Sequence, residues 1–208
     1  MTARFWAATQ KGMSHTSSRH FLFLQGPHGP FFQSLAGGLQ QLGARVSRIG
    51  LNAGDAFFWR GLPDYRAFRG DHTTWRKDLE SAFDEGVTDL VCYGTTRPFH
   101  ALARDLARRR GITIHAFEEG YLRPYWITYE RDGTNAGSAL NALTLVNMRD
   151  ALSASRPAPR PAPDAWGDMR QHVFWGAAYH AVMLVGHHAG IALQYFSSFH
   201  EESRSSIS

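Results

Sequence analysis

Cysteine is nearly absent from this chain, since Cys92 is the only one among 208 residues. One cysteine cannot close a disulfide within the chain, which excludes a disulfide-stabilised scaffold and favours a reducing compartment. Cys92 lies in the apolar run 89–93, so we expect a small core residue rather than a nucleophile. Residues 1–20 contain no apolar stretch before a cleavage site, so no secretory signal and a cytoplasmic location are expected.

An excess of charge of one sign is also lacking. The 22 basic and 18 acidic residues leave a net charge of +4, and the basic cluster 108–110 is expected to end a helix. The sequence has no basic stripe interleaved with aromatic residues and no Cys/His finger spacing, so nucleic acid is not an expected partner. The pair His187 and His188 lacks further ligands at metal spacing, so neither a metal nor a cofactor is expected.

Short apolar runs and runs of helical period alternate along the first 120 residues. The 43% hydrophobic content is enough for one packed domain, expected over residues 20–152 behind a flexible segment 1–19. The alternation predicts an α/β fold, a Rossmann-like parallel sheet flanked by helices. The expected strands are residues 21–25, 44–49, a short one near 67, 88–93 and 112–117. The expected helices are residues 31–42, 74–85 and 98–110.

The last quarter of the chain has a different composition. Alternating prolines over residues 153–163 predict an extended linker. Residues 171–200 contain no Asp, Glu, Lys or Arg, but histidines interrupt the apolar residues. We therefore expect a long apolar helix over 164–196 that packs on protein, with a membrane span as the alternative. A polar tail is expected over 197–208.

Three loops should meet where the parallel strands end, and ligands bind at that edge in open α/β sheets. They are residues 25–30, 94–98 and 118–124. Glu118 and Glu119 are candidates for acid–base or nucleophilic chemistry because paired carboxylates at a strand end can face a cleft. Adjacent side chains there point in different directions, so one carboxylate can be catalytic and the other structural. A solvated acidic loop is the alternative.

Further candidates for substrate contact lie in the same three loops and just beyond them. Arg123 can pair with an anionic group, and Tyr125 and Trp126 offer flat faces that suit sugar rings. The alternative for these aromatic residues is burial against a helix. The loop containing His28 has N–H groups that can hold an anion, and His28 itself is either structural or a substrate contact. The other candidates are Gln25, Gly26, Pro27, Thr95, Arg97, Asn135 and Ser138.

The long run 118–130, Glu-Glu-Gly-Tyr-Leu-Arg-Pro-Tyr-Trp-Ile-Thr-Tyr-Glu, is the most specific feature of the sequence. With Gln25-Gly-Pro27 upstream and Asn135-Ala-Gly-Ser138 downstream, it resembles the capsule polysaccharide biosynthesis/export protein family. Within that family it resembles the KpsS-type β-Kdo glycosyltransferases, where Kdo is 3-deoxy-D-manno-oct-2-ulosonic acid. The resemblance extends over roughly residues 20–190.

The resemblance implies two Rossmann-like domains of GT-B type that face a cleft. It also implies retaining transfer of Kdo from CMP-β-Kdo to a lipid-linked acceptor, phosphatidylglycerol that is unmodified or already primed with Kdo. In this family the middle acidic residue of the Glu-Glu-Gly motif is the candidate nucleophile, which corresponds to Glu119 here, where related modules often have Asp. A lipid-linked acceptor implies peripheral association with the inner membrane, and capsule assembly or export proteins are possible partners.

The chain departs from the family pattern after residue 152. The family's second Rossmann-like domain supplies the CMP site and a His-Pro motif, and this sequence contains no His-Pro dipeptide. We therefore expect the chain to be an incomplete fragment without the donor-nucleotide site and without measurable turnover of its own. A non-catalytic capsule export or assembly factor that binds polysaccharide or proteins is the alternative function. An unrelated sugar-nucleotide-binding module is a third.

Overall fold

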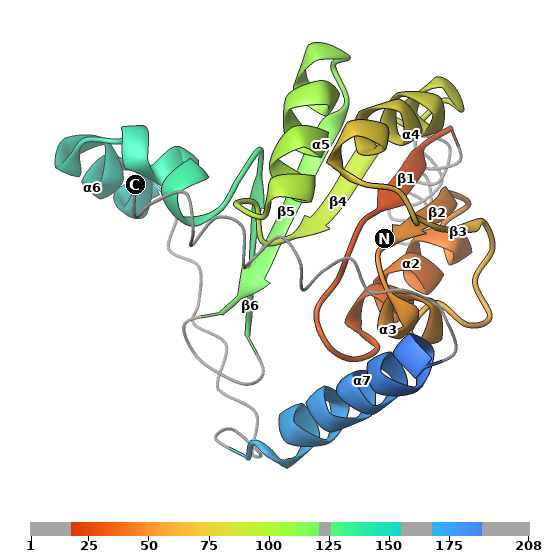
Figure 1. Ribbon diagram of the computed structural model, residues 1–208. Helices are drawn as coiled ribbons and strands as arrows, with labels where there is room; N and C mark the ends of the chain where they lie inside the picture. The colour runs from red at the N-terminus through yellow and green to blue at the C-terminus, as the bar shows by residue number, and fades with distance from the viewer. Residues whose placement is uncertain (1–17, 121–125, 155–167, 189–208) are drawn as a thin grey trace, which may run out of the picture.

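The protein is an α/β sandwich built on one six-stranded sheet (Figure 1). The structure, a computed structural model, describes residues 18–120, 126–154 and 168–188. The strands are β1 (His20–Phe23), β2 (Arg45–Gly50), β3 (Tyr65–Ala67), β4 (Asp89–Tyr93), β5 (Thr113–Glu119) and β6 (Ile127–Arg131). Their order is β3-β2-β1-β4-β5-β6, with β1 to β5 parallel and β6 antiparallel to β5.

Helices cover both faces of the sheet. The helices among the described residues are α2 (Phe31–Gln41), α3 (Ala53–Phe57), α4 (His72–Asp84), α5 (Pro98–Arg109), α6 (Leu145–Ala154) and α7 (Arg170–His188), with two short 3-10 turns, η1 (Asn135–Gly137) and η2 (Ala139–Ala142). One apolar core packs α4 and α5 against the sheet, and a second packs α2 against the opposite face. Figure 1 shows α6 projecting from the sheet and α7 lying beside α3.

The predicted alternation of strands and helices over residues 20–119 is confirmed. The central strands are covered by helices on both faces, and every residue of β1 and β4 is buried. This burial accounts for the short apolar runs from which the strands were predicted. Cys92 is completely buried in the first core, as expected. Burial raises the pKa of its thiol to about 12, so Cys92 is a core residue and not a thiolate near neutral pH. The basic cluster 108–110 lies at the end of α5, as predicted.

The region after residue 117 differs from the expected loop. Glu118 and Glu119 belong to β5, because β5 continues to pair with β6, Glu118 with Thr128 and Glu119 with Ile127. The sheet is therefore not wholly parallel. The sequence did not predict β6, because its residues continue the aromatic run before it and were interpreted as part of one irregular segment. The helix α3 and the turns η1 and η2 were not predicted either.

The predicted C-terminal helix exists but starts later than expected, at Arg170. It packs on α3 through Tyr179 and Met183, which contact Phe58. Among the described residues, no helix is both long and apolar enough to cross a membrane. α6 extends over the first two residues of the expected linker, and residues 155–163 lie outside the described part of the chain.

Candidate functional site

A cavity of about 580 Å³ opens at the edge of the sheet where the parallel strands end. Its walls are the loop after β1, the start of α2, the residue before α5, the end of β5, the start of β6, and one face of α7. The lining residues used below are Gln25, Gly26, Pro27, His28, Asn52, Arg97, Glu119, Trp126, His172, Trp175, Tyr179 and His180. This is the edge at which the sequence placed the ligand site.

Seven of the residues singled out in the sequence come together here: Gln25, Gly26, Pro27, His28, Arg97, Glu119 and Trp126. The loops that carry them are tied to each other, because Arg97 donates a hydrogen bond of 2.7 Å to the side-chain oxygen of Gln25. Gln25 is 3% exposed, so this hydrogen bond is shielded from water and fixes the two loops relative to each other. Residues 72 positions apart thus form one wall of the cavity.

The two adjacent carboxylates separate, as expected for neighbours on a strand. Glu119 lines the cavity, whereas Glu118 does not. Glu118 accepts a hydrogen bond of 3.4 Å from the hydroxyl of Thr134, which is completely buried. Gly94, which has φ +72°, passes close to Glu118, because a Cβ built there would lie 3.9 Å from its carboxylate. Glu118 therefore belongs to the packing between β5 and the loop after β6.

The remaining candidates lie away from the cavity or outside the described residues. Thr95 is buried, and its carbonyl accepts a hydrogen bond of 2.9 Å from Arg104. Asn135 begins η1 with φ +52°, and its carbonyl accepts from Asn141. Ser138 donates to Glu130 at 2.5 Å. Arg123 and Tyr125 lie outside the described residues.

Trp126, from the same aromatic run, lines the cavity. Its indole N–H is buried and has no hydrogen-bond partner among the described residues. An indole N–H normally finds an acceptor when it is buried. Trp126 therefore gives the cavity wall an aromatic surface, while its indole N–H lies buried behind that surface.

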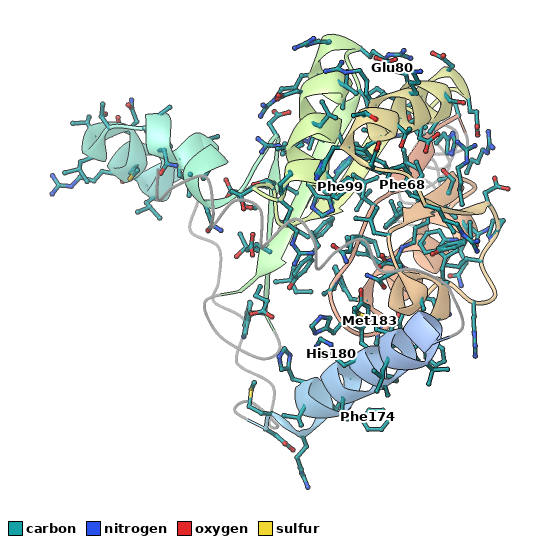
Figure 2. All side chains as sticks on the ribbon, viewed as in Figure 1. Phe68, Glu80, Phe99, Phe174, His180 and Met183 are labelled. Carbon is teal, nitrogen blue, oxygen red and sulfur yellow. The ribbon has the colours of Figure 1, made fainter. Side chains whose placement is uncertain are left out.

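The sequence did not predict that α7 would form a wall of the site. The ring of His28 lies 4.5 Å from that of Tyr179 and 4.9 Å from that of His180. Figure 2 shows His180 and Met183 extending from α7 toward the sheet, and Phe174 extending away from it. Burial lowers the pKa of His28, and the neighbouring His180, Arg97 and His172 lower it further. His28 is therefore neutral near pH 7.

A buried polar network on β2 and α3 supports the loop after β1. Asp55 is completely buried and pairs with Arg48 at 2.5 Å. The Asp55 carboxylate also accepts hydrogen bonds from the backbone N–H groups of Leu51 and Gly26. Burial raises the pKa of Asp55, and the Arg48 guanidinium opposes that rise. Because the Gly26 N–H donates a hydrogen bond to Asp55, α3 fixes the position of the loop that carries Gln25 and His28.

Asn52 joins this network to α7. Its side-chain oxygen caps α3 by accepting from the Asp55 N–H at 3.0 Å, and it also accepts from the Tyr179 hydroxyl at 2.9 Å. Asparagine is a preferred N-cap residue, so the sequence contained a signal for the start of α3 that was not used. The bond to Tyr179, which spans 127 positions, had no signal in the sequence.

The arrangement suits a polar, oxygen-rich ligand. It combines one carboxylate, one guanidinium, imidazoles, buried N–H donors and aromatic surfaces around a concave space. Over residues 18–120, 126–154 and 168–188, no cluster of three or more His, Cys, Asp or Glu side chains is placed to hold a metal ion.

Comparison with known proteins gives consistent results. Residues 88–165 match a family model described as capsule polysaccharide biosynthesis protein. The capsule polysaccharide export protein KpsS of Escherichia coli is 39% identical over 130 residues, 60% of this chain and 32% of that protein. The capsule polysaccharide modification protein LipB of Neisseria meningitidis serogroup A is 41% identical over 133 residues, 60% of this chain and 30% of that protein. The chain spans about a third of the length of these relatives.

Proposed function

We propose that the chain, whose residues 88–165 match the capsule polysaccharide biosynthesis protein family, acts in capsule polysaccharide biosynthesis and binds an acidic saccharide in the cavity beside α7. The finer proposal is retaining β-Kdo transfer from CMP-Kdo to a lipid-linked acceptor. The chain contributes the wall that carries Glu119. Because the matched segment covers only about a third of each relative, this proposal concerns the activity of a protein of the relatives' length.

One observation carries the proposal: Glu119 lines the same cavity as the loop 25–28 and Arg97. A carboxylate with hydrogen-bonding groups around it is the usual nucleophile or acid–base group of enzymes that transfer sugars. Glu119 also comes from the Glu-Glu-Gly run, which lies within the segment that matches the family. Geometry and sequence therefore favour the same residue.

The proposed mechanism has two displacements. The Glu119 carboxylate attacks the anomeric carbon of Kdo as the bond to CMP breaks and CMP leaves. The acceptor hydroxyl then attacks the same carbon, the bond to Glu119 breaks, and the hydroxyl proton passes to a base. Each step inverts the anomeric carbon, so the product retains the configuration of the donor. Trp126 and Trp175 supply aromatic surfaces on which a sugar ring can stack.

The adjacent carboxylates provide a matched pair of variants for the test. Glu119→Gln and Glu118→Gln make the same chemical change one residue apart, but only Glu119 lines the cavity. In the full-length protein supplied with CMP-Kdo and a Kdo-primed lipid acceptor, we expect Glu119→Gln to lower transfer by about 10³-fold or more. Glu118→Gln should stay within about tenfold of the parent protein. Equal rates for Glu119→Gln and the parent protein would contradict the assignment.

The alternative is a non-catalytic factor in capsule export. The name of the Escherichia coli relative, capsule polysaccharide export protein, favours it. An export factor that only binds polysaccharide needs no reactive carboxylate. If the parent protein binds a Kdo oligosaccharide but transfers no Kdo under any donor condition, the export role replaces the transferase role.

A further inference from the structure

We infer that the cavity contains a built oxyanion site, formed by the Asn52 amide, Arg97, His28 and the N-terminal end of α2, which takes a carboxylate or phosphate group. This inference deepens the proposed function and rests on it for the role of the cavity. It adds a residue, Asn52, that neither the sequence motifs nor the family segment at residues 88–165 assigned.

The Asn52 amide is the observation that points to a ligand. The side chain is only 5% exposed, and its oxygen is occupied by the Asp55 N–H and the Tyr179 hydroxyl. Both partners are donors, so they occupy the oxygen and leave the amide nitrogen as the group that can bind an acceptor, and Asn52 lines the cavity. That nitrogen is buried and has no partner among the described residues. A buried donor without an acceptor costs roughly 1–3 kcal/mol, which an oxygen atom of a ligand would recover.

The N-terminal end of α2 supplies further donors. The first N–H groups of a helix have no partners within it, and they bear partial positive charge. α3 and α4 are capped by the side chains of Asn52 and Asp71, whereas α2 has no side-chain cap and no acidic residue in its first turn. Pro30 and Phe31, where α2 begins, line the cavity. This helix end therefore favours an anion beside His28.

The charges around the cavity favour an anion over a cation. Among the described residues that line it, the titratable groups are Arg97, His28, His172, His180, Glu119 and two tyrosines. Glu119 is the only acidic residue of this set, and the imidazoles can donate N–H bonds even when neutral. A cation would meet a single carboxylate and several hydrogen-bond donors, whereas an oxyanion would accept hydrogen bonds from those donors. The ligand class is thus a carboxylate or phosphate of a saccharide.

The inference can be tested on the 208-residue chain by titrating inorganic phosphate, and separately acetate, with calorimetry as the readout. We expect Asn52→Ser and Arg97→Gln each to weaken binding about tenfold, the equivalent of one lost charge-assisted contact. Serine keeps an oxygen that can cap α3 but removes the amide N–H groups. Arg109→Gln is the matched charge control, because Arg109 is exposed at the far end of α5 and does not line the cavity.

The outcomes separate this site from the proposed reaction. Glu119→Gln should bind phosphate at least as tightly as the parent chain, because it removes a repelling carboxylate, although it blocks transfer. Phosphate and acetate distinguish the two sources of the anion, and binding of either one with the expected variant pattern supports the site. The inference is overturned if neither phosphate nor acetate binds at millimolar concentration. It is also overturned if Arg109→Gln and Asn52→Ser weaken binding equally. Circular dichroism of each variant checks that it has folded.

Discussion

The stability of the fold should depend on pH through His100. This residue is completely buried in the first turn of α5, and its ring N–H donates to the carbonyl of Gly94 at 2.8 Å. Burial lowers the pKa of His100 from 6.5 to about 4. The folded chain therefore resists a proton that the unfolded chain accepts below pH 6.5. Stability is complete above that pH and is lost as the pH falls toward 4.

The expected loss follows from the two pKa values. Each pH unit between them is worth about 1.4 kcal/mol, so His100 lowers the free energy of unfolding by about 2 kcal/mol at pH 5 relative to neutral pH. Urea denaturation at both pH values measures the loss. His100→Gln keeps an N–H donor but does not titrate, so its loss between the two pH values should be smaller by about the same 2 kcal/mol. An identical loss in the variant and the parent chain refutes the reasoning.

Three other predictions concern the support of the site. Arg48→Leu leaves the Asp55 carboxylate buried without its cation and should lower the free energy of unfolding by about 3–5 kcal/mol in denaturant titrations. Gly54→Ala places a Cβ 2.4 Å from the Tyr179 ring, so α7 must shift, and phosphate binding should fall while α7 stays helical by circular dichroism. Sulfate should bind more tightly as the pH falls from about 7 to about 5.5, because His28, which faces His180, His172, Arg97 and Glu119, has a pKa lowered from its ordinary value and gains a proton only in acid; a flat calorimetric affinity over this range would contradict the prediction.

The sequence predicted the parts of the fold that depend on local pattern. The apolar runs of β1 and β4 and the helical period of α2 are each visible within a few residues. The meeting of Glu119 with the loop 25–28 also followed from the sequence, because parallel strands end at a common edge.

The contacts that could not be predicted join distant parts of the chain. α7 has apolar residues on all sides, with Phe174 exposed and Met183 buried, so its period does not show which face packs on α3. The contacts of Tyr179 with Asn52 and His28 depend on that face. For the same reason the sequence did not single out Asn52, and its unpaired amide nitrogen became visible only in the folded protein.

The position of a covalent Kdo adduct tests the central claim most directly. The full-length protein is mixed with CMP-Kdo and a slowly reacting acceptor, quenched in acid, digested and analysed by mass spectrometry. The proposed double displacement predicts a Kdo adduct on the peptide that contains Glu119, and fragmentation should place it on Glu119 rather than Glu118. Transfer with inversion of the anomeric carbon, or an adduct on any other residue, would contradict the account.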